Sequence, residues 1–183
     1  MFRLFAALPV PEEVHDGLVE LQKGLEGASW RPTENFHITL RFFGEVNGAI
    51  ARDLDHELGQ IGMPQLELEA IGTDFFGRRE PYSVHAVVRG VDEENHVELK
   101  RLARRCEGAA RRAGLPPEPR PFKPHITLAY LHNTPPDAVG GYVKRTSHYR
   151  SGPFWVDRFH LYSSQTFSKG PTRYTAEADY PLG

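Results

Sequence analysis

The chain has 183 residues, which is enough for one core or for two small lobes that share an interface. Its formal net charge of −2 excludes a globally basic surface for duplex nucleic acid, so any nucleic-acid contact has to be local. The single cysteine, Cys106, excludes an internal disulfide framework and is expected to be a buried, inert thiol in a reducing compartment. The apolar segment 2–10 is too short to span a membrane and is interrupted by Arg3, so we expect a cytoplasmic protein without membrane contact.

Hydrophobic periodicity divides the chain into two halves of similar order. The first half is predicted to contain a strand at 2–8, a helix that begins at Glu12, a strand at 36–43, a helix at 48–58 and a strand at 65–70. A loop rich in glycine, proline and arginine, at 72–81, is expected to join the halves. The second half is predicted to contain a strand at 82–89, a helix at 93–113, a strand at 126–131, a short helix within 135–146 and strands near 154–162 and 172–178. The inner stripe of the long helix is expected to carry Val97, Leu102, Ala103 and Cys106.

The tetrapeptide His-Ile-Thr-Leu occurs twice, at 37–40 and at 125–128, each time in a predicted strand that follows an aromatic or proline lead-in. In each half a strand and a helical stretch precede the motif, and a turn and a helix follow it. This order indicates an internal duplication of a supersecondary unit. We therefore expect a single domain over 1–183 with two lobes, roughly 1–75 and 82–165, and a strand near 172–178 that closes the fold.

Alternation along a strand decides which motif side chains share a face. In the first copy, strict alternation places His37, Thr39 and Arg41 on one face and the apolar residues on the other. In the second copy it places His125 and Thr127 together. If a pseudo-twofold axis relates the lobes, both His-x-Thr faces line the same cleft.

Two imidazoles on opposite sides of one substrate suit phosphodiester chemistry. Near neutral pH one histidine can take a proton from the attacking oxygen while the other gives a proton to the leaving oxygen. The hydroxyls of Thr39 and Thr127 can donate to non-bridging phosphate oxygens, and no metal is required. A single strand histidine is more often structural, and two histidines without an accompanying Asp, Glu or Cys fall short of a zinc site. Their equivalent positions favour the catalytic interpretation of His37 and His125.

Other residues are candidates for contact with a phosphodiester substrate. Arg41, on the predicted histidine face, is the best candidate for a backbone phosphate. Phe43 and Phe76 can stack a terminal base, although each is more often part of a core. His85 is expected to be structural and is a weak candidate for the cleft.

The doubled motif, FHITLRFFGEV at 36–46 and PHITL at 124–128, with RLFAA at 3–7 and LYSS at 161–164, resembles the two-histidine phosphoesterase superfamily. The branch that it resembles most is the bacterial and archaeal RNA 2',3'-cyclic phosphodiesterases, historically named 2'-5' RNA ligases. The resemblance spans nearly the whole chain. It implies a bilobal α+β fold with an antiparallel sheet in each lobe, outer helices and a central cleft.

The resemblance further implies hydrolysis of a terminal 2',3'-cyclic phosphate, on RNA 3' ends or on nucleotides, to a 2'-phosphate without a metal or other cofactor. By analogy with relatives, His125 becomes the base that activates water and His37 the acid that protonates the departing 3' oxygen. Thr39 and Thr127 become the residues that hold the phosphate. We expect the protein to act as a monomer.

One position departs from the family pattern. Many relatives carry an arginine five residues after the second motif histidine, where this chain has Tyr130. The tyrosine hydroxyl can still donate to phosphate, but strict alternation turns Tyr130 towards the core. Only a bulge or a strand end would bring it to the site.

Two other functions stay open. Reversible 2'-5' ligation of RNA ends is allowed by microscopic reversibility. A non-catalytic RNA-binding module is the second alternative, although a binder has no need of two imidazoles and two hydroxyls in matched positions. A tRNA fragment, a longer RNA and a small cyclic nucleotide all present the same terminal group, so the sequence does not choose among them.

Overall fold

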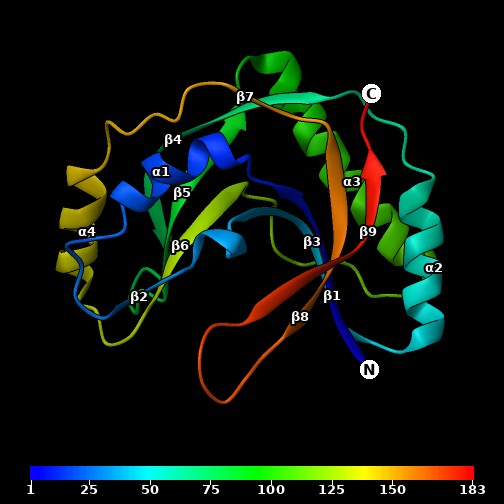
Figure 1. Ribbon diagram of the computed structural model, residues 1–183, viewed down its shortest axis with the longest axis horizontal. Helices are drawn as coiled ribbons and strands as arrows, with labels where there is room; N and C mark the ends of the chain where they lie inside the picture. The colour runs from blue at the N-terminus through cyan, green and yellow to red at the C-terminus, as the bar shows by residue number, and fades with distance from the viewer.

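The computed structural model describes residues 1–183 and contains nine strands, four α-helices and one short 3-10 helix (Figure 1). The strands are β1 (Phe2–Pro9), β2 (Ala28–Trp30), β3 (His37–Val46), β4 (Leu66–Phe76), β5 (Ser83–Gly90), β6 (His125–Leu131), β7 (Phe154–Val156), β8 (Arg158–Gln165) and β9 (Arg173–Pro181). The helices are α1 (Glu12–Glu20), the 3-10 helix η1 (Thr33–Asn35), α2 (Gly48–Gly59), α3 (Glu93–Arg112) and α4 (Pro136–Arg145). None of these helices combines the length and the apolar composition that crossing a bilayer demands.

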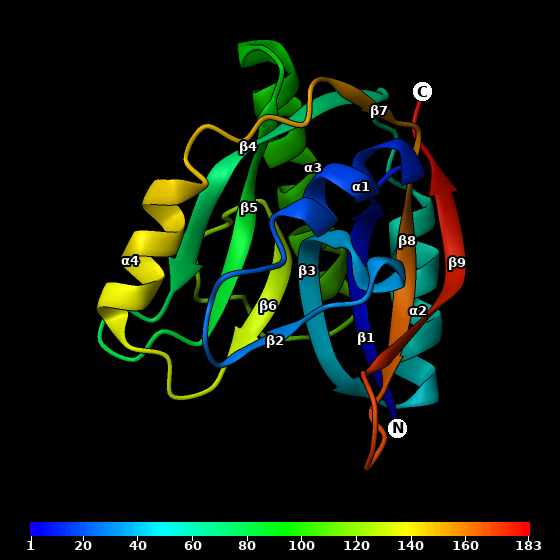
Figure 2. The same cartoon turned by 60° about the vertical axis from the view of Figure 1, so that its left-hand side comes forward.

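The strands form two antiparallel sheets, which confirms the predicted α+β class. The strand order is β3-β1-β8-β9 in the first sheet and β2-β6-β5-β4-β7 in the second. The two motif strands, β3 and β6, lie against each other where the sheets meet (Figure 2). The duplicated motifs therefore come from different sheets but face a common region.

Each half of the chain gives strands to the sheet of the other half. The motif strand of each half pairs with the first strand of the same half, β3 with β1 and β6 with β5. Other strands cross over. From the first half, β2 pairs with β6 and β4 pairs with β5, and from the second half, β8 pairs with β1. Each sheet thus takes strands from both expected lobes, 1–75 and 82–165. The sequence does not predict this exchange, because periodicity marks a strand without identifying its partner.

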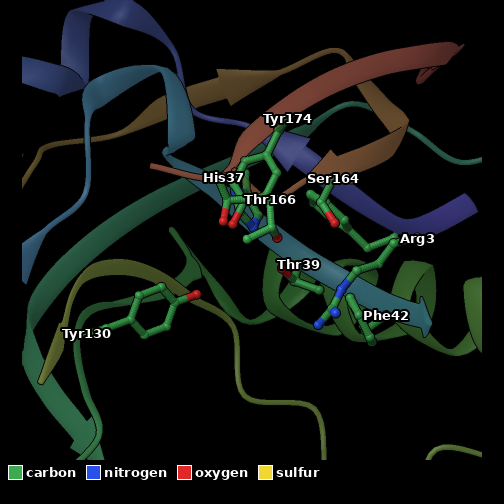
Figure 3. Close-up of a pocket in the computed structure, with 10 residues that line it drawn as sticks. Arg3, His37, Thr39, Phe42, Tyr130, Ser164, Thr166 and Tyr174 are labelled. Atoms are coloured by element: carbon green, nitrogen blue, oxygen red, sulfur yellow. The ribbon is translucent and has the colours of Figure 1, made fainter. Parts of the chain in front are cut away.

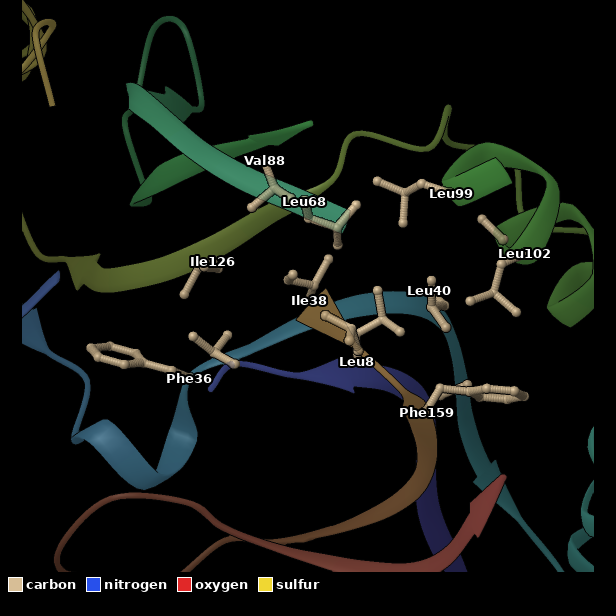
Figure 4. Close-up of a cluster of buried hydrophobic side chains, with 14 of the residues drawn as sticks. Leu8, Phe36, Ile38, Leu40, Leu68, Val88, Leu99, Leu102, Ile126 and Phe159 are labelled. Carbon is tan, nitrogen blue, oxygen red and sulfur yellow. The ribbon is translucent and has the colours of Figure 1, made fainter. Parts of the chain in front are cut away.

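One continuous hydrophobic core fills the space behind both motif strands (Figure 4). Ile38 of β3 and Ile126 of β6 are fully buried in it, as are Leu99 and Leu102 of α3. The helix α3 packs against β3 of the first sheet and against β4 and β5 of the second, so it bridges the two sheets. Because the apolar motif residues face this core, the histidines and threonines between them face the other way.

The bridging helix α3 follows its predicted range because both of its ends carry clear signals. The Asp92 side chain accepts a hydrogen bond from the Asn95 backbone N–H at 2.8 Å, and Gly114 beyond the helix has a φ of 94°. Cys106 is buried as expected, and burial raises the pKa of its thiol. Val97 is 37% exposed and does not belong to the inner stripe, because it lies about 140° around the helix from Leu102.

Two strands are longer than predicted, because the glycine in each marks a bulge and not the end of the strand. The first motif strand continues through Gly44, which has a φ of 78°, to Val46. The strand β4 continues through Gly72, which has a φ of 63°, so it takes up half of the predicted loop 72–81. The register of the ladder shifts beside both glycines.

Two other differences concern short strands. The three-residue strand β2 was not predicted, because it is too short to show alternation. The predicted strand 154–162 is divided at Asp157 into β7, which belongs to the second sheet, and β8, which belongs to the first.

Candidate active site

Both His-x-Thr pairs border one cleft between the sheets. His37 and Thr39 come from β3, His125 and Thr127 come from β6, and all four line a cavity of about 1000 Å³. Burial is the main cause of the lowered pKa of His37, and the charge of His125 across the cleft adds to it. The duplication therefore delivers two equivalent sets of side chains to the same space.

Both motif histidines are held in the same tautomer. The Nδ1 atom of His37 lies 2.7 Å from the backbone carbonyl oxygen of Asn35, and that of His125 lies 2.6 Å from the carbonyl oxygen of Lys123. A carbonyl oxygen only accepts, so each Nδ1 carries the hydrogen and donates it. In the neutral rings each Nε2 is therefore left as a free acceptor that can take a proton.

Burial keeps both motif histidines neutral in the unliganded cleft. Loss of solvation lowers the pKa of His37 to about 4, against the opposing effect of its bond to the Asn35 carbonyl. Burial also lowers the pKa of His125, again opposed by a bond to a carbonyl, that of Lys123. At neutral pH both histidines can accept a proton, and an anion in the cleft would favour their charged forms.

Aromatic rings fix the orientation of each histidine. The ring of Phe5 lies 4.9 Å from that of His37 between centroids, and Tyr174 meets His37 edge-on at 5.1 Å. Phe76 meets His125 edge-on at 5.0 Å. Phe76 also lines the cleft, as one of the two predicted base-stacking candidates.

A β-bulge follows the threonine of the first motif. In the pairing of β1 with β3, Thr39 lies opposite Ala7 and Arg41 lies opposite Ala6, so Leu40 is an extra residue. Beyond a bulge the alternation of side chains reverses. The prediction that Arg41 shares the face of His37 and Thr39 is therefore wrong.

Arg41 has a structural environment instead. Its side chain is 7% exposed, and although it borders the cleft, its guanidinium donates to the Glu107 carboxylate of α3 and to the backbone carbonyls of Phe42 and Pro116. Phe43 also departs from prediction, because it is 6% exposed and belongs to the core, where no base can stack on it. Phe42, turned by the bulge, lines the cleft in its place.

The second motif strand carries the same bulge. In its pairing with β5, Thr127 lies opposite His85 and Ala129 lies opposite Val84, which leaves Leu128 as the extra residue. Tyr130 is thereby turned to the histidine face, where it is 42% exposed and lines the cleft. The structure thus has the bulge that the sequence-based argument required.

Sequence reasoning gave too little weight to His85. Its ring lies 4.7 Å from that of His125, it is 5% exposed, and its buried Nδ1 has no hydrogen-bond partner. Burial, with the nearby charges of His125 and Lys123, lowers its pKa to about 3. The signal that could have placed it is the alternation of β5, in which Val84 and Ala86 face the core.

A smaller cavity of about 250 Å³ adjoins His37 (Figure 3). Tyr130 reaches towards it from the second sheet, while Thr39 and Phe42 border it from β3. The remaining lining residues are Arg3, Phe5, Ser164, Thr166, Thr172 and Tyr174. Hydroxyl groups and one guanidinium therefore face the space beside the motif histidine.

Charged side chains border the wider part of the cleft. Its cationic lining residues are Arg31, Arg41, Lys100, Arg104, Arg120 and Lys123. Of its two carboxylates, Glu107 pairs with Arg41 and Glu118 pairs with Arg120. Nowhere in the chain do three or more His, Cys, Asp or Glu side chains gather in a way that could hold a metal ion.

The fold and the two facing His-x-Thr strands are those of a two-histidine phosphoesterase. The family model described as LigT like Phosphoesterase matches residues 8–85 and 90–172, which together cover most of the chain. The chain belongs to this family.

Relatives of known sequence and structure agree with this assignment. An Archaeoglobus fulgidus protein named RNA 2',3'-cyclic phosphodiesterase is 30% identical over 172 residues, which cover 92% of this chain and 94% of that protein. An Aeropyrum pernix protein of the same name is 37% identical over 99 residues, so this chain matches 54% of its length. The structure of Escherichia coli LigT complexed with 3'-AMP matches with a TM-score of 0.78 at 26% identity, over 99% of this chain and 98% of that chain.

Proposed function

We propose that this protein hydrolyses the terminal 2',3'-cyclic phosphate of RNA to a 2'-phosphate, with His37 and His125 as an acid–base pair and without a metal ion. The observation that carries the proposal is the pair of half-buried imidazoles whose Nδ1 atoms are both bonded to backbone carbonyls. Both rings line a cleft that Thr39 and Thr127 also line, and in each neutral ring Nε2 is the nitrogen that can take a proton. The names of the relatives in Archaeoglobus fulgidus and Aeropyrum pernix support the substrate class.

The proposed reaction balances with water as the only co-reactant. The base, His125, takes one proton from water at Nε2 while the water oxygen bonds to phosphorus. The bond between phosphorus and the 3' oxygen breaks, its electron pair stays on that oxygen, and the acid, His37, gives it a proton from Nε2. The products are a 2'-phosphate and a free 3'-hydroxyl, and proton exchange with solvent restores the two rings.

The acid role requires His37 to be charged when substrate is bound. Burial holds its pKa at about 4 in the free cleft, so His37 is neutral there at pH 7. A cyclic phosphate carries a negative charge, and an adjacent anion raises the pKa of a histidine. Substrate binding would thus charge the group that has to protonate the leaving oxygen.

The hydroxyls of Thr39 and Thr127 hold the non-bridging phosphate oxygens in this proposal. Negative charge grows on those oxygens in the transition state, and fixed donors there lower the barrier. Further out, Lys100 and Arg104 of α3 and Lys123 line the same cleft, which suits the phosphates of an attached RNA chain.

The test uses an RNA oligonucleotide that ends in a 2',3'-cyclic phosphate, in the presence of EDTA. The expected result is full turnover, with a 2'-phosphate as the only product by phosphorus NMR, and no turnover of a 3',5'-cyclic mononucleotide. Loss of activity on chelation and its rescue by a divalent ion would contradict the metal-free mechanism. Adding RNA with a 5'-hydroxyl end tests ligation, because a joined 2'-5' product would then accumulate.

A further inference from the structure

Arg31 is fixed beside the second motif by the short strand β2. Its backbone N–H donates to the carbonyl oxygen of Leu128 at 2.8 Å, one residue beyond Thr127. The side-chain amide of Gln22 donates to the carbonyl oxygens of both Arg31, at 2.8 Å, and Leu128, at 3.1 Å. These bonds hold the end of β2 against β6 at the level of the phosphate-holding threonine.

The guanidinium of Arg31 lies over the ring of Tyr130, with 4.9 Å from its central carbon to the ring centroid. It reaches that ring because the bulge turns Tyr130 to the cleft face. A flat aromatic ring beneath the guanidinium restricts the orientation of the guanidinium, and the N–H groups at the edge of the guanidinium can still donate. Tyr130 therefore serves as a platform for Arg31.

The guanidinium is short of acceptors in the free protein. One terminal nitrogen donates to the Ser29 hydroxyl at 3.2 Å, whereas the buried Nε has no partner and no carboxylate forms an ion pair with this residue. A buried donor without an acceptor is costly, and native proteins rarely keep one without a reason. Arg41 and Arg120, which border the same cleft, are by contrast paired with Glu107 and Glu118.

The position of Arg31 points to the reacting phosphate as an acceptor for its terminal nitrogens, because Nε is buried too deeply to be reached from the cleft. Arg31 lines the cleft together with both motif histidines and with Tyr174, whose ring stands edge-on against His37. Burial, reinforced by Tyr130, raises the pKa of Tyr174 to about 12, and the charge of Arg31 opposes this increase. The guanidinium therefore borders the part of the cleft that both motif histidines line.

We propose that Arg31 donates to a non-bridging oxygen of the phosphate held between His37 and His125, and that the ring of Tyr130 keeps the guanidinium in place for this contact. This inference rests on the proposed function. The contact grows stronger as charge builds on the phosphate, so it acts mainly on kcat. Arg31 is in this view a catalytic residue contributed from outside the two motifs.

The decisive experiment compares R31Q and R31K with wild type on a mononucleotide 2',3'-cyclic phosphate. R31Q is expected to lower kcat about 10²-fold with a smaller change in KM, and R31K is expected to recover only part of this loss because it lacks the fork of donors. The control is R89Q, which removes a strand arginine that pairs with Glu69 and lines neither cavity. Thermal melts establish that each variant is folded.

A second readout does not depend on turnover. Inorganic phosphate, titrated by phosphorus NMR, is expected to bind R31Q about tenfold more weakly than wild type or R89Q. The inference is overturned if R31Q and R31K match R89Q in both assays, or if R31Q impairs only oligonucleotide substrates. If wild type opens no cyclic phosphate, the proposed function fails, and the phosphate titration alone still decides whether Arg31 binds the anion.

Discussion

The imidazole rings of His85 and His125 lie 4.7 Å apart between centroids, although the two residues come from different strands, β5 and β6. Thr127 lies opposite His85 in the ladder, so the ring of His85 supports the motif histidine from the neighbouring strand. His85 thus places a buried, neutral imidazole beside the proposed base. This arrangement has consequences for the acid stability of the protein.

Replacing His85 with phenylalanine should make the free energy of unfolding less sensitive to acid. In the folded chain the pKa of His85 is lowered to about 3, whereas the unfolded chain titrates near 6.5. Between these values only the unfolded state binds the proton, so stability falls as pH decreases, by up to about 1.4 kcal/mol per pH unit for this group. Urea unfolding at several pH values should show that the free energy of unfolding of H85F changes with pH less steeply than that of wild type, by about this amount.

The control for this prediction is H56A, which removes an exposed histidine of α2 and should keep the wild-type slope. H85Q provides a second non-titrating variant in case the larger ring of phenylalanine does not fit beside Phe76. An unchanged pH dependence in both His85 variants would show that His85 is not buried in neutral form.

The two motif histidines should behave as one catalytic unit. H37A and H125A should each lower kcat by about 10²–10⁴-fold, and the double variant should be little slower than the worse single one, because acid and base act in the same step. Single-turnover kinetics on a cyclic-phosphate mononucleotide measure the effect, with H56A as the control. Independent, multiplicative losses would argue against a concerted pair.

The acid and the base can be told apart by the leaving group. A substrate in which sulfur replaces the 3' oxygen releases a thiolate, which needs little protonation. The variant that lacks the acid should therefore regain most of its activity on this substrate, and the proposed roles predict recovery for H37A but not for H125A. Recovery of H125A alone would exchange the two roles.

Arg41 should matter for stability and not for RNA binding. Its guanidinium is buried against Glu107, and removing one member of such a pair leaves the other without its partner, which costs about 3–5 kcal/mol. R41A should unfold at a lower urea concentration, while the salt dependence of oligonucleotide binding should match wild type. A flatter salt slope in R41A would place Arg41 on the RNA after all.

The sequence predicted the elements well where each one carries its own signal. Periodicity located β1, β5 and α2, and cap residues such as Asp92 and Gly114 bounded α3. The repeated His-x-Thr segments also located the four side chains that meet in the cleft. These features are local, so they can be read without knowing which strands pair.

The features that sequence reasoning missed depend on pairing. Nothing in the residues of β3 shows that Leu40 lacks a partner on β1, yet this bulge turns Arg41 away from the cleft and Phe42 into it. Likewise, a strand of three residues is too short to show alternation, so the sequence pattern does not mark Arg31 as a residue of the cleft. Bulges and edge strands are defined by how strands pair, and the pairing is known only from the three-dimensional structure.

The exchange of β4 and β8 has a consequence for the origin of a chain like this one. A single half, whose strand β4 or β8 pairs outside its own unit, would expose an unpaired sheet edge. A second copy of the same half would cover this edge best. Two such copies would form an intertwined homodimer with a twofold axis through the cleft, and each would contribute one His-x-Thr strand. Joining the copies in one polypeptide would free the two motifs to diverge, as Arg41 against Ala129 and Phe42 against Tyr130 illustrate.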